Sequence, residues 1–177
     1  KADAQALPFE SGRFDRYFSC LNLMLVPEPT RALREAHRVL NDEGIAVWVV
    51  WGRADHSPLM TLLPEAAREV GLDLPQPPRS NFHLGSLELM RALLKAAGFE
   101  RQRMWYQQMP TDCERGEGFA EMILSERPEL DQFIETDTQR QALRNVLSKN
   151  AQARLDDGEP LGLDTLIVVA RKSPAQP

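Results

Sequence analysis

The stretch LVPEPTRALREAHRVLNDEGIAVWVVW, residues 25–51, carries a helix pattern followed directly by a strand pattern. Its proline at position 29 suits the first turn of a helix, where no backbone N–H is needed. The residues that follow recur at the spacings of three and four that are typical of one helix face: Leu33, Ala36, His37 and Leu40. We expect the polar residues 41–44 to end this helix. The apolar run at residues 45–51 then predicts a strand covered on both faces, as in a parallel sheet.

A second strand pattern lies upstream of this stretch. Residues 14–19, FDRYFS, follow turn-like residues 10–12 and lead into an apolar loop at residues 21–26. Strand, helix and strand in this order make a βαβ unit. The sequence therefore predicts an α/β protein.

Two more helices are expected after this unit. Ser57 is expected to cap the first of them, which Pro64 should kink or divide. Ser86 is expected to cap the second, which Gly98 should end. The proline-rich residues 74–85 between the two helices predict a surface loop.

The last part of the chain combines two strands with a helical segment. Residues 99–108 are β-prone but polar, which suits an edge strand, whereas residues 163–170 are apolar throughout, which suits a central strand. Residues 116–157 between them predict two or three helices. The only GxG, at residues 116–118, follows no strand pattern and is expected to be the turn that starts a helix.

Composition and charge argue against several classes of function. The 177 residues carry a net charge of −5, with 21 basic and 26 acidic residues, so nucleic acid is not an expected partner. The longest apolar run is too short to span a bilayer and no signal-peptide pattern is seen, so we expect a cytoplasmic protein without membrane contact. Cys20 and Cys113 lie far apart without a CxxC pair, which predicts free thiols and no metal site.

Four segments, taken in order, resemble one enzyme family: DAQALPF at residues 3–9, FDRYFS at 14–19, the stretch at 25–51, and LLKAAGF at 93–99. Together they are similar to the C-terminal half of the class I S-adenosylmethionine-dependent methyltransferases, of the kind grouped with small-molecule enzymes of ubiquinone and menaquinone biosynthesis. The resemblance implies the C-terminal half of a doubly wound, Rossmann-like α/β sheet, with parallel strands and a final antiparallel strand. It also implies a single partial methyltransferase domain over residues 1–177, with a helical insertion at residues 109–160 before the last strand.

The resemblance further implies which residues bind S-adenosylmethionine. Asp3 and Ala4 match the pair that contacts adenine in the family, where the acid accepts from the exocyclic amine. Without the segment behind it, Asp3 would be explained as a solvated acid. Cys20 and Leu21 match the segment that passes under the cofactor, and packing at the strand end explains them as well. Many relatives have a histidine where this chain has residues 24–25, which argues against a reaction that needs that base.

Methyl transfer from a sulfonium depends on alignment more than on a protein nucleophile, so the remaining candidates are bases and acceptor-binding groups. His56 follows the strand at residues 45–51, at the end where doubly wound sheets bind ligands, and is a candidate catalytic base. His83 is a second candidate, explained equally well as a surface histidine. Trp51 and Arg53 are candidates for an aromatic wall and an anion anchor, although a tryptophan there also suits the core.

These observations predict S-adenosylmethionine-dependent methyl transfer to a small molecule, with RNA left open as an acceptor. The family's glycine-rich turn and ribose-binding acid are missing from the sequence, so the chain alone is expected to be inactive. An exposed sheet edge is then expected where the family's first strand would pair, and such an edge is prone to strand exchange or association. The alternative is a noncatalytic binding or assembly protein that keeps the methyltransferase scaffold.

Overall fold

The computed structural model describes residues 1–172, which divide into two compact units. The first unit contains residues 1–53, 79–107 and 165–172, and the second contains residues 54–78 and 108–164. The expectation of a single domain over residues 1–177 stays a prediction, and its last residues, 173–177, lie outside the described part of the chain.

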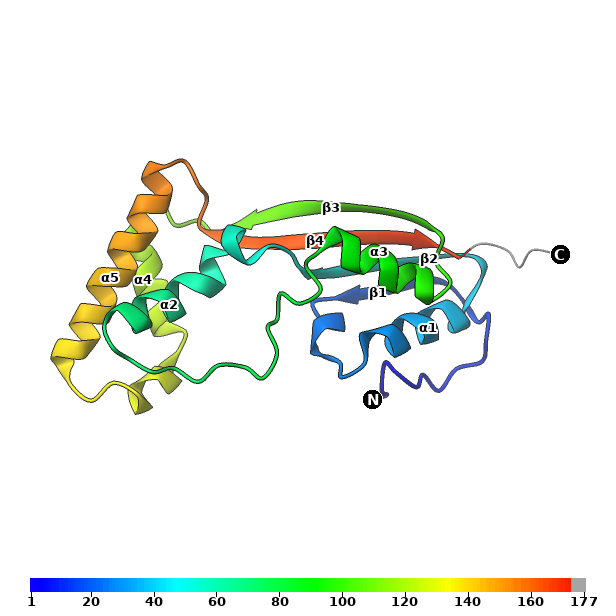
Figure 1. The fold of residues 1–177 in the computed structure, drawn as a ribbon, viewed down its shortest axis with the longest axis horizontal. Helices are drawn as coiled ribbons and strands as arrows, with labels where there is room; N and C mark the ends of the chain where they lie inside the picture. The colour runs from blue at the N-terminus through cyan, green and yellow to red at the C-terminus, as the bar shows by residue number, and fades with distance from the viewer. Residues whose placement is uncertain (173–177) are drawn as a thin grey trace. The chain divides into compact units, whose positions relative to one another are not determined.

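Four strands form one mixed sheet in the order β1-β2-β4-β3 (Figure 1). They are β1 (Phe14–Cys20), β2 (Leu40–Trp51), β3 (Arg101–Pro110) and β4 (Gly162–Arg171). β1 pairs with β2 in parallel, and β4 pairs with β2 in antiparallel orientation. The expected α/β architecture with a final antiparallel strand is confirmed. As expected, β3 is an edge strand and β4 is a central strand, and β1 forms the other edge.

The helices of the first unit cover one face of this sheet. α1 (Pro29–Val39) has Pro29 in its first turn, and it contacts α3 (Leu87–Ala96). Ser86 caps α3 as expected, because its hydroxyl accepts a hydrogen bond from the Leu89 N–H at 3.3 Å. Apolar side chains of both helices pack on the residues of β2 and β4 that point to this face, including Trp48, which is fully buried.

The start of β2 differs from the sequence-based expectation. α1 ends at Val39, and the strand already begins at Leu40, which pairs with Phe14. The register then shifts to a pair of Arg16 with Ile45, so residues 41–44 form a bulge between the two pairs. The strand is therefore longer than expected, because its polar start is held by pairing with β1.

Aromatic rings connect the helices to the sheet. The buried ring of Phe99 meets Trp48 at 5.3 Å and His37 at 5.0 Å between ring centroids, both edge to face. His37 therefore packs against the core as expected, and burial lowers its pKa. Gly98 ends the α3 segment with φ +98°, and a Cβ there would lie 2.9 Å from the His37 ring, so this position requires glycine.

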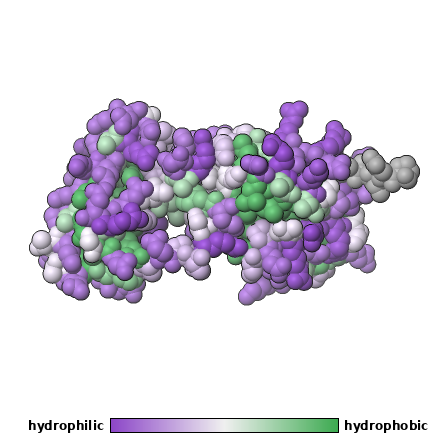
Figure 2. Space-filling view, viewed as in Figure 1, coloured by the Kyte–Doolittle hydropathy of each residue, from purple (hydrophilic) through white to green (hydrophobic). Residues whose placement is uncertain are grey.

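The second unit is mainly helical and also contains the end of β3 and the start of β4. Its helices are α2 (Pro58–Glu69), α4 (Gly116–Ser125) and α5 (Asp137–Asp156), with the short 3-10 segments η2 (Ala54–His56) and η3 (Pro128–Gln132). Both α2 and α4 pack on α5, and Figure 2 shows hydrophobic atoms among these helices with hydrophilic atoms around them. The GxG starts α4 as expected, whereas the expected division of α2 at Pro64 is wrong, because the helix runs through it.

Candidate functional site

The carboxyl ends of β1 and β2 lie at the same edge of the sheet because the two strands are parallel. Cys20, the last residue of β1, pairs with Val49, and the N–H of Leu21 donates to the Val49 carbonyl at 2.8 Å. The predicted cofactor segment therefore lies beside the end of β2. Cys20 is exposed and has a free thiol.

The chain turns sharply at Leu21. Its φ of +48° is in the left-handed region, and it is the only residue other than glycine with positive φ in the described part of the chain. For a residue with a Cβ this conformation costs about 1–2 kcal/mol, and such costs are concentrated at functional sites. The turn leads into η1 (Leu23–Leu25), where Met24 is buried and Leu25 is exposed.

An arginine from a distant part of the sequence holds this segment. The Arg79 guanidinium donates to the carbonyls of Met24, Val26 and Pro27 at 3.2, 2.7 and 3.2 Å. Donation from a cation makes each of these bonds stronger than a neutral one. The loop at residues 79–85 is therefore fixed to the segment that follows β1, a contact that no local pattern in the sequence predicts.

The end of β2 forms an aromatic corner, which consists of Trp51, Arg53, Phe82 and Tyr106. The Trp51 and Phe82 rings lie 5.4 Å apart, and the Arg53 guanidinium lies 4.3 Å above the Tyr106 ring. The Tyr106 hydroxyl donates to the buried Gly85 carbonyl at 2.8 Å. The structure therefore brings both predicted acceptor-binding residues together with the loop that carries His83.

Gly85 allows the loop to approach β2 closely. A Cβ at this position would overlap the carbonyl oxygen of Gly52, the residue that directly follows β2. Close backbone contact of this kind admits only glycine. No local pattern in the sequence marks Gly85, because the requirement arises from a contact between distant segments.

His83 has one ring nitrogen bound and one unbound. Its Nδ1 lies 2.7 Å from the Ser80 carbonyl, which can only accept, so we assign the ring proton to Nδ1. Its Nε2 then has a free lone pair, and it is buried without a hydrogen-bond partner among the described residues. The Trp51 Nε1–H is buried without a partner in the same part of the structure. Both groups belong to the first unit, where the Trp48 Nε1–H and the Gln102 Oε1 are also buried without a partner among the described residues.

The N-terminal residues expected to bind adenine form a separate turn. The Asp3 carboxylate accepts from the Gln5 N–H at 2.9 Å, and this bond holds the pKa of Asp3 below its ordinary value. The Gln5 side chain in turn accepts from the Glu28 N–H at 2.8 Å, just before α1. The turn is therefore tied to the start of α1.

A pair of charged residues on α1 fixes the rest of the N-terminal segment. The Glu35 carboxylate accepts from the Leu7 N–H at 2.8 Å, and Arg38 donates to the carbonyls of Leu7 and Phe9 at 3.0 and 2.7 Å. The hydrogen bond from Arg38 lowers the pKa of Glu35. Glu35 and Arg38 are three residues apart on one helix face, a spacing that marks a pair but does not reveal the bonds to the distant backbone.

His56 belongs to the second unit. Its backbone carbonyl accepts from the Gln108 side chain at 3.0 Å, and its ring lies 3.7 Å from the Asp55 carboxylate. Its assignment to an acceptor pocket stays a prediction.

Residues 1–172 show neither a metal-binding cluster nor a membrane-spanning helix. These residues contain no group of three or more histidine, cysteine, aspartate or glutamate side chains that could hold a metal ion. None of their helices has the length and apolar composition needed to cross a membrane.

Comparison with known sequences shows that one segment of the chain is similar to methyltransferases. Residues 1–48 match a family model described as a methyltransferase domain. The chloroplastic 2-methyl-6-phytyl-1,4-hydroquinone methyltransferase 2 of Oryza sativa subsp. japonica is 41% identical over 49 residues, which are 28% of this chain and 14% of the rice protein. The rice methyltransferase 1 of the same name is 44% identical over 46 residues, 26% of this chain and 14% of its own. The matches thus span a small part of these relatives.

Comparison with solved structures extends over nearly the whole chain. The [4+2]-cyclase SpnF has a TM-score of 0.52 and 20% identity, over 97% of this chain and 55% of the cyclase. A candidate methyltransferase from Bacillus halodurans C-125 has a TM-score of 0.50 and 19% identity, over 98% of this chain and 70% of that protein. At these identities the likeness shows the fold alone. The resemblance of this chain to the class I S-adenosylmethionine-dependent methyltransferases is thereby confirmed, by the family model over residues 1–48 and by the fold over most of the chain.

Proposed function

We propose that this chain is part of an enzyme that transfers a methyl group from S-adenosylmethionine to a small-molecule acceptor at the carboxyl ends of β1 and β2. The match to the methyltransferase domain over residues 1–48 carries this proposal, because it covers β1 and most of β2. Doubly wound sheets bind their ligands at this end of the strands. The strained turn at Leu21, at the same end, supports the location.

The residues proposed to hold the cofactor fit it chemically. Gln5 lies closer to Oδ1 of Asp3 than to Oδ2, so Oδ2 keeps lone pairs that can accept from the adenine amine. The adjacent Ala4 N–H is the proposed donor to an adenine ring nitrogen. Cys20 and Leu21 are proposed to lie under the cofactor. When bound, S-adenosylmethionine supplies a methyl carbon made electrophilic by the sulfonium.

The aromatic corner is the proposed binding site for the acceptor. Trp51 and Phe82 offer ring faces for a flat apolar molecule, and Arg53 offers a cation for an oxygen that carries negative charge. The names of the rice relatives describe hydroquinone methyltransferases, and a phenolate on an aromatic ring has these two features. We therefore take a hydroquinone as the first acceptor class to test.

His83 is the proposed base. As the bond between acceptor and methyl carbon forms and the bond from sulfur to that carbon breaks, the acceptor loses a proton. The free lone pair on Nε2 of His83 suits this proton, because Nδ1 is held by Ser80. Since Nε2 is buried, the loop at residues 79–85 must move before an acceptor reaches it. His56 remains a second proposed base.

The 177 residues by themselves are proposed to be inactive. The glycine-rich turn and the ribose-binding acid of the family are not among them, so the cofactor would lose most of its charged and hydrogen-bonded contacts. Titration calorimetry of this chain with S-adenosylhomocysteine should show no tight binding. Tight one-to-one binding by a verified monomer would contradict this part of the proposal.

The central experiment is a methyl-transfer assay on the full-length natural protein with methyl-labelled S-adenosylmethionine and 2-methyl-1,4-hydroquinone. Arg53→Gln should raise the acceptor KM about tenfold, because a charge-assisted contact is lost. Arg91→Gln on α3 removes the same charge away from the site and is the matched control. His83→Gln should lower kcat by about 10²-fold or more. Equal kinetics for all three variants would refute the assignment of the site.

The second candidate is a protein that keeps the scaffold without methyl transfer. The observation in its favour is that a protein named as a [4+2]-cyclase has this fold, so the fold alone does not fix the chemistry. No methyl transfer by the full-length protein, together with no binding of S-adenosylhomocysteine, would favour this candidate.

A further inference from the structure

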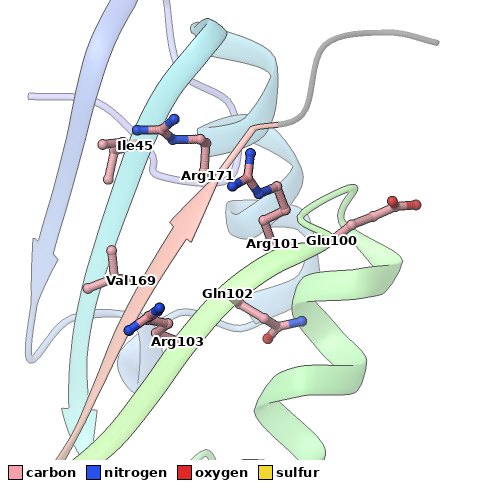
Figure 3. Close-up of a pocket in the computed structure, with 7 residues that line it drawn as sticks. All are labelled: Ile45, Glu100, Arg101, Gln102, Arg103, Val169 and Arg171. Atoms are coloured by element: carbon pink, nitrogen blue, oxygen red, sulfur yellow. The ribbon is translucent and has the colours of Figure 1, made fainter.

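A pocket of about 440 Å³ lies beside the start of β3 and the end of β4 (Figure 3). Its lining comes from three strands of the first unit and the residue before β3: Ile45, Glu100, Arg101, Gln102, Arg103, Val169 and Arg171. Ile45 and Trp51 are six positions apart on β2, so the pocket and the aromatic corner are separated by roughly 20 Å at the usual strand rise. The pocket is therefore distinct from the proposed methyl-transfer site.

The apolar part of the pocket lies on the sheet face opposite α1 and α3. Ile45 and Val169 alternate along their strands with Ala46 and Ala170, which belong to the core under those helices. Side chains alternate between the two faces of a sheet, so Ile45 and Val169 point to the other face. They give the pocket an apolar floor.

Three arginines make the pocket strongly basic. Arg101 and Arg171 come from β3 and β4 and extend toward the same end of the sheet, and Arg103 extends from β3 across β4 (Figure 3). Their guanidinium groups make no hydrogen bond or ion pair with any of residues 1–172. Glu100 is the one acid in the lining, so the local charge is opposite to the net charge of −5 of the chain.

We propose that this pocket binds a small organic phosphate. Guanidinium groups bind phosphate oxygens through paired hydrogen bonds. None of the three is paired with a carboxylate of the described residues, so all three can donate to one phosphoryl group. The floor of Ile45 and Val169 suits an apolar body attached to the phosphate. The volume is within the range of small-molecule sites, about 300–1,000 Å³. A second copy of this chain on the same face would bring the unpaired guanidinium groups of both copies together, and the repulsion between these like charges argues against it.

The test is titration calorimetry of the 177-residue chain with phenyl phosphate, which combines the proposed charged head and apolar body. Phenyl phosphate should bind one-to-one with a millimolar or lower Kd, and inorganic phosphate should bind at least threefold more weakly. Phenol should not bind, because it has the ring without the charge. Equal affinity for phenyl phosphate and inorganic phosphate would overturn the proposed role of the apolar floor, and no binding of either would overturn the site.

Charge-matched variants separate a specific site from general attraction. Arg103→Gln and Arg171→Gln should each weaken phenyl phosphate binding about tenfold, because each removes a charged donor from the pocket. Arg91→Gln removes one positive charge from α3, on the other face of the sheet, and should leave the affinity within twofold of the parent. Circular dichroism of each variant checks that it is folded. Equal weakening by all three substitutions would show non-specific attraction and overturn the proposal.

Discussion

The two tyrosines of this chain give a matched test of how the loop at residues 79–85 is held. The Tyr106 hydroxyl donates to the Gly85 carbonyl at 2.8 Å, and Gly85 is buried. Tyr106→Phe leaves this carbonyl without that donor, and an unsatisfied buried polar group costs about 1–3 kcal/mol. Tyr17 makes no hydrogen bond through its hydroxyl to the described residues, so Tyr17→Phe should change the stability by less than about 0.5 kcal/mol.

The difference in stability between the two variants can be followed by a signal that comes from the first unit only. All three tryptophans, Trp48, Trp51 and Trp105, belong to this unit, so their fluorescence follows its unfolding. A loss of about 2 kcal/mol, with a urea m-value of about 2 kcal/mol/M, lowers the unfolding midpoint by about 1 M. Tyr17→Phe should move the midpoint by no more than about a quarter of that shift.

The urea midpoints of the two variants also test whether the Tyr106 hydrogen bond stabilises the first unit. If Tyr106→Phe and Tyr17→Phe shift the midpoint equally, the bond to Gly85 does not stabilise the first unit. A change in the m-value instead of the midpoint would mean that the variant alters the extent of unfolding and not the stability of the loop contact. Far-UV circular dichroism on the same samples reports the helices of the second unit as well, and so shows whether the two units unfold together.

Two further predictions concern His37 and Arg79. Burial and the nearby Lys172 hold the pKa of His37 below its ordinary value of 6.5, while Asp42 acts in the opposite direction. The unfolded chain therefore binds a proton at higher pH than the folded chain, so stability should fall as the pH drops below about 6.5. His37→Phe should flatten the plot of urea midpoint against pH below about 6.5. An unchanged slope would show that His37 does not cause the fall in stability. Arg79→Gln should speed amide hydrogen exchange at residues 22–28, whereas Arg34→Gln, an exposed substitution on α1, should leave it unchanged, and equal exchange in both variants would contradict the role of Arg79.

Periodicity along the chain was sufficient to predict most of the fold. The alternation of helical spacing and apolar runs gave the βαβ unit, the edge position of β3 and the central position of β4. It failed at residues 41–44, where a polar, glycine-containing segment suggested a loop. Pairing between Phe14 and Leu40 overrides that local preference and makes the segment a bulge in β2. Long-range pairing of this kind has no local pattern in the sequence.

The candidate site was predictable in part. The position of Trp51 and Arg53 at the carboxyl end of β2 follows from the order of helix and strand. The contacts of Arg79 and Glu35 do not, because each side chain bonds to backbone groups far away along the sequence. Backbone acceptors have the same chemistry at every residue, so nothing in the sequence marks the ones that will be used.

The positions of the loops at the candidate site are held by bonds to backbone carbonyls, and not by the side chains that the loops carry. Arg79 donates to three backbone carbonyls in the segment that follows β1, and Tyr106 donates to the carbonyl of Gly85. Neither bond depends on which side chain the contacted residue carries, except that Gly85 must remain glycine to clear Gly52. Exposed side chains of these segments, such as that of Leu25, can therefore change while the loops keep their positions. On the proposed function, side chains such as Phe82 would set the choice of acceptor, and the residues that hold the backbone should stay the same.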